Sequence, residues 1–119
     1  MENEFWDHLD HLVSSNPLVI DRPKGSTHPN YKNEVYPLDY GYLKDIFSGD
    51  GGDLDVWVGS NVDKKIDGFI CTIDLIKRDL EVKILIGCSE IEVQTILDFH
   101  NSGSMPAIFI KHEGFVNDG

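Results

Sequence analysis

The spacing of apolar residues predicts a helix near each end of the chain. From Phe5 to Val13 the apolar side chains recur at helical spacing, with acidic residues and histidines on the opposite face. Near the C-terminus, Ser89 is followed three residues later by Glu92, which is typical of a capping box, and the helix is expected to reach about His100. Both patterns indicate amphipathic helices that pack against other elements.

Short segments rich in β-branched and apolar residues lie between and after these helices and predict strands. The expected strands occupy residues 18–20, 42–47, 54–59, 68–76, 81–87 and 107–111. About five or six short strands with flanking helices favour a mainly β protein of the α+β class, built as a small β-barrel or closed sheet. The length of 119 residues indicates a single domain, 1–119.

Composition narrows the choice of partners. The chain carries 21 aspartates and glutamates against 10 lysines and arginines, a formal net charge of -11, which disfavours binding to the phosphate backbone of nucleic acids. No apolar run is long enough to cross a membrane. Cys71 and Cys88 lie in apolar runs without a preceding signal peptide, so we expect two reduced thiols in the cytoplasm. Metal cations or metal-complexed anions are the ligands that suit such an acidic chain.

A loop rich in glycine and aspartate is the strongest candidate for chemistry. Asp50, Asp53 and Asp55 fall within six residues, and the glycines among them let the backbone turn tightly enough to aim carboxylates at one point. Magnesium is the natural occupant of such a site. The alternative is an exposed acidic turn that binds nothing, and local composition does not separate the two.

A second polar cluster lies at the start of the predicted strand 81–87, the second strand of the expected hairpin. Glu81 and Lys83 are two residues apart, so on a strand they share one face and could hold a metal and an anion together. Taken alone, an exposed hairpin tip of mixed charge explains them more simply. Lys24 is either a phosphate contact or a solvated loop lysine, and Tyr40 is either a phosphate donor or a core ring.

Three segments together resemble the family I (soluble, magnesium-dependent) inorganic pyrophosphatases. They are Pro23-Lys24-Gly25-Ser26, then Tyr36-Pro37-Leu38-Asp39-Tyr40-Gly41-Tyr42, then Asp50-Gly51-Gly52-Asp53-Leu54-Asp55-Val56. In that family a YPxNYGY-like segment is followed, at the separation seen here, by DGDPLDV. The resemblance covers about residues 18–87. It implies an OB-like five-stranded barrel whose acidic cavity binds several magnesium ions and hydrolyses diphosphate to two phosphates by a metal-activated water.

The resemblance also implies roles for the matching residues. Asp50 and Asp55 match magnesium ligands, and Tyr40 matches a tyrosine that contacts phosphate or the metal-bound water network. Glu81 and Lys83 look like a later pair in which the carboxylate binds metal and the lysine binds phosphate. The expected metal ligands are Asp50, Asp53, Asp55 and Glu81, the expected phosphate-binding residues are Lys24, Lys83 and Tyr40, and the expected catalytic residues are Asp53, Asp55 and Tyr40.

The chain departs from the family pattern at the position that matters most for proton transfer. Gly52 replaces the aspartate that accepts a proton from the nucleophilic water, and Asp53 occupies the proline position, one residue away. Asp53 is therefore the candidate replacement. Asp39 stands in place of the usual asparagine and adds negative charge near the anion site.

Three functions compete at this stage. The first is magnesium-dependent hydrolysis of diphosphate. The second is a pyrophosphatase-like fold that has lost the reaction and serves as a metal-binding or protein-interaction module, which Gly52 motivates. The third is hydrolysis of another small phosphorylated metabolite, because shortened segments would widen the cavity. The oligomeric state is open, since a helix with Phe5 and Trp6 could cover either the barrel or a neighbouring subunit in a homo-oligomer.

Overall fold

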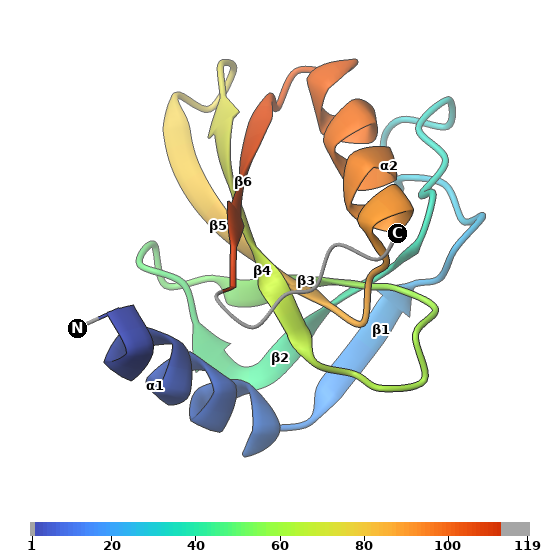
Figure 1. The fold of residues 1–119 in the computed structure, drawn as a ribbon. Coiled ribbons are helices and arrows are strands. Elements are labelled where there is room, and N and C mark those ends of the chain that lie inside the picture. Colours follow the sequence, from blue (N-terminus) through green and yellow to red (C-terminus); the bar gives the residue numbers. More distant parts are fainter. Residues whose placement is uncertain (1, 113–119) are drawn as a thin grey trace.

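The computed structural model describes residues 2–112, which form two helices and six strands of a mainly β protein of the α+β class. The elements are α1 (Glu2–Ser14), β1 (Leu18–Arg22), β2 (Asp39–Phe47), β3 (Asp53–Val58), β4 (Ile66–Asp74), β5 (Asp79–Ile86), α2 (Glu90–Asn101) and β6 (Ala107–Lys111). Figure 1 shows their arrangement. Neither helix in this part of the chain has the length and apolar character that a membrane span requires.

The six strands form one open sheet in the order β1-β2-β3-β5-β4-β6. Neighbours are antiparallel except for β3 and β5, which run parallel because the chain passes through β4 between them. The mainly β class is therefore confirmed, whereas the expected closed five-stranded barrel is not. Within residues 2–112, β1 pairs only with β2 and β6 only with β4, so the two edges of the sheet do not join. A pattern of apolar residues marks strands but does not determine which strands pair across the sheet.

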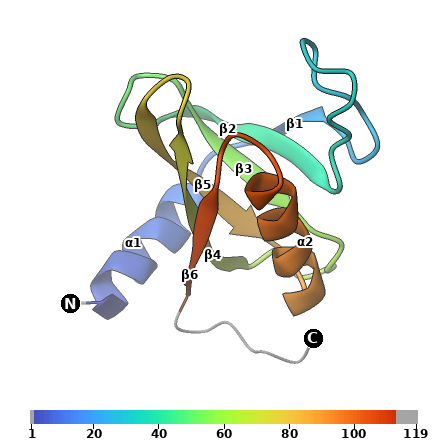
Figure 2. The same cartoon turned by 90° about the horizontal axis from the view of Figure 1, so that it is seen from above.

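Alternation of side chains gives this sheet two different faces. On one face, Asp55 and Trp57 of β3 lie beside Lys83 and Leu85 of β5. Figure 2 shows α1 and α2 on opposite sides of strands β4 and β6. Helix α2 packs with Trp57 and Leu85, so the charged pair belongs to the α2 side of the sheet. We call this side the inner face and the α1 side the outer face.

Each face has its own hydrophobic cluster. The inner cluster contains Tyr36, Leu38, Trp57, Ile70, Leu85, Cys88, Val93 and Ile96. The outer cluster contains Leu43, Ile46, Leu54, Val56, Val58, Ile66, Ile84 and Ile86, with Leu9, Val13, Ile20 and Phe69 packed against it. The two helices thus cover the two faces, as their predicted apolar stripes require.

The capping box predicted for the second helix is confirmed. The Ser89 hydroxyl accepts a hydrogen bond from the Glu92 N–H at 3.2 Å, and the Glu92 carboxylate accepts one from the Ser89 N–H at 3.0 Å. Glu92 also accepts from the Ser60 N–H at 3.2 Å, which ties the start of α2 to the loop that follows β3. These bonds anchor the N-terminal end of α2 to the sheet.

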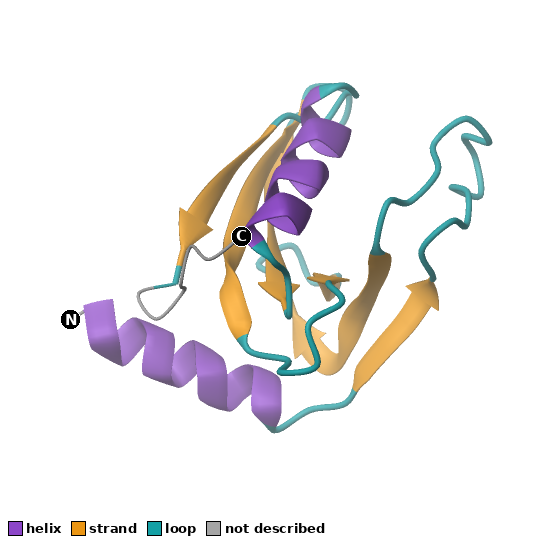
Figure 3. Cartoon of the chain, turned by 45° about the vertical axis from the view of Figure 1, so that its right-hand side comes forward, coloured by secondary structure: helices purple, strands orange, loops and turns teal. Residues whose placement is uncertain are grey.

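Residues 23–38 form an arm between β1 and β2 that stands away from the sheet (Figure 3). Its base is closed by hydrogen bonds from the Gly25 N–H to the Tyr36 carbonyl and from the Tyr36 N–H to the Ser26 carbonyl, both at 2.9 Å. The Asp39 carboxylate accepts the Lys24 N–H at 2.8 Å. Asp39 therefore holds the arm in place through a side-chain oxygen.

A buried carboxyl group links β4 to the turn before α2. Asp67 is 5% exposed, and its Oδ2 atom accepts a hydrogen bond from the Cys88 N–H at 2.6 Å. Burial raises the pKa of Asp67 to about 6, although the hydrogen bond from Cys88 acts in the opposite direction. Burial and the neighbouring Asp67 carboxyl also raise the pKa of the Cys88 thiol, which therefore stays protonated.

We expect Asp67→Asn to change how stability depends on pH. The raised pKa means that the folded chain binds more protons than the unfolded chain between pH 3.8 and about pH 6. The contribution of Asp67 to stability is therefore full at the acid end of this range and is lost as the pH rises through about 6. Relative to Asp67→Asn, the wild-type free energy of unfolding should fall by about 2 kcal/mol across the range.

Urea unfolding of both proteins at a series of pH values measures this difference. Asp63→Asn serves as the control, because the Asp63 side chain is 73% exposed and forms a salt bridge with the exposed Lys65. Parallel stability profiles for wild-type and Asp67→Asn would contradict the assignment.

Candidate functional site

Three polar side chains from neighbouring strands meet on the inner face of the sheet. Tyr40 comes from β2, Asp55 from β3 and Lys83 from β5, and Asp55 lies directly beside Lys83 in the parallel pair. The Tyr40 hydroxyl donates to Asp55 Oδ2 at 2.7 Å, while Lys83 Nζ donates to the Tyr40 hydroxyl at 2.7 Å and to Asp55 Oδ2 at 3.0 Å. The buried ammonium of Lys83 is thus balanced by a carboxylate, as buried charges require.

The Tyr40 hydroxyl is a permanent hydrogen-bond donor in this group. Burial, followed by the charge of Asp55, raises the pKa of Tyr40 well above its ordinary value. The phenol therefore stays protonated across the physiological range. Because it also accepts a hydrogen from Lys83, Tyr40 holds the ammonium and the carboxylate in a fixed relation.

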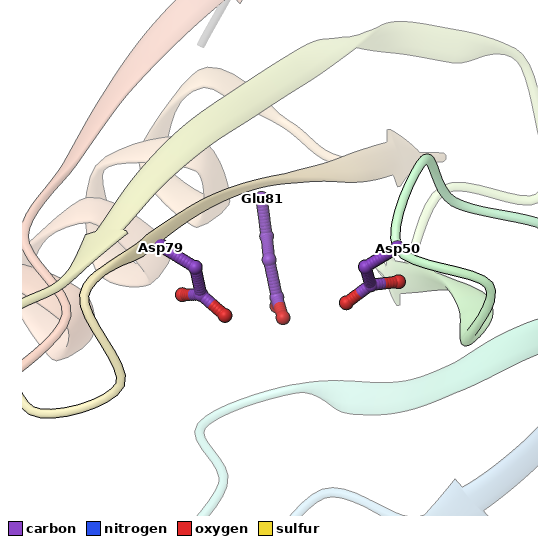
Figure 4. Close-up of side chains that lie close together, drawn as sticks. All are labelled: Asp50, Asp79 and Glu81. Carbon is purple, nitrogen blue, oxygen red and sulfur yellow. The ribbon is translucent and has the colours of Figure 1, made fainter.

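Three carboxylates gather beside this group. One oxygen each from Asp50, Asp79 and Glu81 lies within 4.8 Å of the others, and Figure 4 shows the three side chains directed towards a common space. Asp79 and Glu81 point the same way because they are two residues apart on β5. Oxygen ligands at such spacing are what hard divalent cations bind. We call these three residues the acidic triad.

Local hydrogen bonds fix the position of Asp50 within the acidic triad. The Gly52 N–H donates to Asp50 Oδ1 at 2.9 Å, and the Ser48 hydroxyl donates to the same oxygen. Both bonds lower the pKa of Asp50, and the bond from Ser48 has the larger effect. The Asp50 carboxylate therefore stays ionised. Asp79 Oδ1 is buried and has no hydrogen-bond partner among the described residues. A bound cation would satisfy that oxygen, which is otherwise costly to bury.

The two groups belong to one site. Lys83 Nζ lies 3.7 Å from the Glu81 carboxylate, so the lysine contacts both Asp55 and a member of the acidic triad. Tyr40, Asp55 and Lys83 line a cavity of about 940 Å³, which the arm and the segment after α2 flank, and Glu81 is the member of the acidic triad that lines it with them. Its charged lining residues are Asp21, Arg22, Glu34, Asp53, Asp55, Asp74, Lys77, Glu81 and Lys83. Carboxylates outnumber cations in this lining, so the cavity attracts metal ions before it attracts anions.

His100 forms a rigid wall of the cavity. Its Nε2 atom accepts the Trp57 indole N–H at 3.2 Å, and its Nδ1 atom lies 3.1 Å from the Met105 carbonyl. Burial lowers the pKa of His100 to about 4, so the ring is neutral and Nδ1 carries the hydrogen that bonds to Met105. With both nitrogens engaged, His100 orients the end of α2 and offers no free base to a ligand.

The residues predicted to bind metal do not all lie together in the structure. Asp50 and Glu81 meet as expected, but their third neighbour is Asp79, which the sequence interpretation did not select as a ligand. Asp55 contacts Tyr40 and Lys83 instead of joining the acidic triad. The predicted strand began at Glu81 and left Asp79 in the turn, whereas β5 begins at Asp79. A strand extended by two residues would have placed Asp79 on the same face as Glu81.

Two other predicted residues lie apart from these groups. Asp53 is exposed at the start of β3 and lines the cavity without joining the acidic triad. Lys24 does not line the cavity, and its backbone N–H is bound by Asp39. Arg22 and Lys77 do line it, although sequence reasoning assigned them no role. The Arg22 guanidinium donates to the Tyr36 hydroxyl at 2.6 Å, which holds it at the base of the arm.

Comparison of the chain with family models, with curated proteins and with solved structures finds no match. The function of this site is therefore argued from the chemistry of its residues.

We expect the acidic triad to bind divalent cations and each member to contribute. Asp79→Asn and Glu81→Gln remove one charge each with little change in shape, so each should weaken Mg²⁺ binding about tenfold or more. Isothermal titration calorimetry with MgCl₂ measures the affinity directly. Asp63→Asn, which removes an exposed carboxylate away from the site, should bind like the wild type. Equal affinity in all four proteins would show that the acidic triad holds no cation.

Proposed function

We propose that this protein hydrolyses inorganic diphosphate to two phosphates with Mg²⁺ as its cofactor. The observation that carries the proposal is the contact between Lys83 and Glu81, which joins the acidic triad to the hydrogen-bonded group of Tyr40, Asp55 and Lys83 in the lining of one cavity. An oxygen-rich cation site next to a lysine and a tyrosine hydroxyl suits a metal-complexed phosphate compound. The motif resemblance to family I pyrophosphatases points to the same chemistry.

The charge balance of the cavity supports dependence on metal. Diphosphate is a multiply charged anion, and the carboxylates of the lining would repel it in the absence of cations. Asp50, Asp79 and Glu81 are the residues that would hold magnesium, with Asp53 near enough to the cavity to contribute. Bound magnesium would neutralise the substrate and make water a stronger nucleophile.

The side chains of the chain can serve the remaining needs of the reaction. Water attacks one phosphorus, the bond from that phosphorus to the bridging oxygen breaks, and the bridging oxygen leaves with the second phosphate. Lys83 is the donor that would orient the phosphates and stabilise negative charge on the leaving group, because its ammonium has three hydrogens and two of them are donated to Tyr40 and Asp55. Tyr40 gives its single hydrogen to Asp55 and accepts one from Lys83, so Tyr40 and Asp55 together hold the lysine in position.

Asp53 is the proposed acceptor for the proton that water loses. Its exposed carboxylate lines the cavity and stands next to Gly52, which occupies the usual position of this acceptor in the resembled motif. The Gly52 N–H holds Asp50, and the missing side chain leaves room for the Asp50 carboxylate, because a Cβ at position 52 would lie 3.3 Å from Asp50 Oδ1. We infer that this segment exchanges a fixed proton acceptor at position 52 for a better-ordered metal ligand at position 50, with Asp53 as the acceptor.

The size of the cavity favours one alternative substrate class. A volume of about 940 Å³ lies at the upper end of the range for drug-sized ligands and far exceeds what diphosphate fills. Hydrolysis of a larger phosphorylated metabolite would use the same donors and the same acidic triad. The loss-of-reaction alternative, a metal-binding or protein-interaction module, keeps the acidic triad but needs no phosphate donors.

A cytoplasmic location forms part of the proposal. Cys71 and Cys88 are both free thiols in the structure. A reducing compartment maintains that state, which supports the predicted location.

We expect purified protein to release phosphate from diphosphate only when magnesium is present. Asp55→Asn should lower the rate about 100-fold or more, because Lys83 and Tyr40 lose the carboxylate that positions them. Asp53→Asn should lower the rate by a similar factor, because the attacking water loses its proposed proton acceptor. A colorimetric phosphate assay measures all three proteins.

Asp63→Asn, purified in the same way, controls for a contaminating phosphatase and should keep the wild-type rate. Absence of phosphate release in every condition would refute the proposal and favour the metal-binding module. A screen of phosphate esters in which another compound is turned over much faster than diphosphate would favour the alternative substrate class.

A further inference from the structure

The outer face of the sheet carries an uncovered apolar surface at its hairpin end. Strands β5, β4 and β6 are adjacent, and their registers pair Leu80 with Ile73, Val82 with Cys71, and Cys71 with Ile108. Side chains at these positions point to the same face as Phe69, against which α1 packs. We call the six outward positions Cys71, Ile73, Leu80, Val82, Ile108 and Ile110 the apolar outer patch.

This patch is exposed although it contains no polar side chain. Leu80 is 68% exposed, Ile108 63% and Ile73 46%. The intervening residues on β5, Asp79, Glu81 and Lys83, are all charged and belong to the inner face. A half-covered antiparallel sheet ordinarily places polar residues on its solvent face. Contiguous exposed apolar residues on three adjacent strands therefore indicate a contact surface.

Charges of opposite sign lie at the two ends of the patch. At the hairpin end, the exposed Arg78 lies in the turn between β4 and β5. At the other end lies α1, which contacts Phe69 of β4 through Phe5 and Trp6 and carries the exposed carboxylates Glu4 and Asp7. The surface is thus neutral in its middle, cationic at one end and acidic at the other.

We propose that the apolar outer patch binds a second copy of this chain in a symmetric dimer. A twofold axis that lies in the plane of the interface, at right angles to the strands, lays one patch on the other and reverses the direction of the hairpin. The Arg78 turn of each copy then faces α1 of its partner. Sheets pack face to face about 10 Å apart, a distance that apolar side chains fill. This surface is therefore complementary to itself in both polarity and charge.

The net charge of the chain makes the apolar outer patch a better dimer contact than the acidic surfaces of the molecule. Copies with a net charge of -11 repel one another, and this patch brings no carboxylates together at its centre. The acidic triad and the cavity lie on the inner face. Dimer formation at the outer patch therefore leaves the candidate site open, and the dimer stands or falls independently of the proposed function.

Sedimentation velocity of the full chain over a range of concentrations tests the dimer. We expect wild-type protein to associate reversibly to a dimer and Leu80→Lys or Ile108→Lys to raise the dissociation constant by at least tenfold. Both residues are exposed in the single chain, so their substitution should leave the fold intact, which circular dichroism verifies. Val62→Lys is the matched control, because Val62 is 98% exposed and lies in the loop between β3 and β4.

A charge exchange tests the orientation of the two copies. Arg78→Glu should weaken the dimer, and adding Asp7→Lys to the same chain should restore part of the loss, since each contact then pairs opposite charges again. Wild-type protein that stays monomeric up to about 100 μM would overturn the proposal, as would a dimer that Leu80→Lys and Ile108→Lys leave unchanged. A dimer that responds to the apolar substitutions but not to Arg78→Glu would overturn the antiparallel arrangement.

Discussion

The burial of the Lys83 ammonium is the constraint on which the site depends. Lys83 is 4% exposed, and a charge so poorly hydrated requires an ionised partner and further hydrogen bonds. Asp55 supplies the charge and Tyr40 supplies the second acceptor, so side chains from β2, β3 and β5 are locked together. Removing one partner from a buried pair typically costs about 3–5 kcal/mol, which makes this group a structural as well as a chemical centre. The parallel pairing of β3 with β5 is what places Asp55 beside Lys83.

The same pairing explains why the acidic triad forms beside this group. Once Lys83 is directed to the inner face, Glu81 and Asp79 must follow it, because residues two apart on a strand share a face. Asp50 reaches them from the loop before β3, where Ser48 and Gly52 hold its carboxylate. One strand therefore contributes both the lysine and two carboxylates. All three side chains lie on the inner face because they occupy alternate positions of β5.

Local patterns predicted the elements better than their assembly. The capping box of Ser89 and Glu92 and the strand-like segments were readable because they depend on near neighbours in sequence. The open sheet could not be predicted, because β6 pairs with β4 across a long separation in sequence. For the site, the motif resemblance selected Asp50, Tyr40, Asp55, Glu81 and Lys83, and the structure divides these residues between two groups. Asp79 was not predicted as a ligand because the strand was expected to begin at Glu81, which left Asp79 in the turn. Arg22 was not predicted because no local pattern marks it as a cavity residue.

The alternation that builds the inner face also creates the outer one. Every residue of β5 that adds a charge to the site is followed by a residue directed away from it, and at Leu80 and Val82 these are apolar. Polar residues there would have cost the site nothing, so their absence is not a by-product of the chemistry. Helix α1 covers the same face around Phe69 and stops short of the hairpin end. A sheet that uses one face for a charged cavity and leaves part of the other face apolar suits the two contacts proposed above, a small charged ligand on one side and a protein surface on the other.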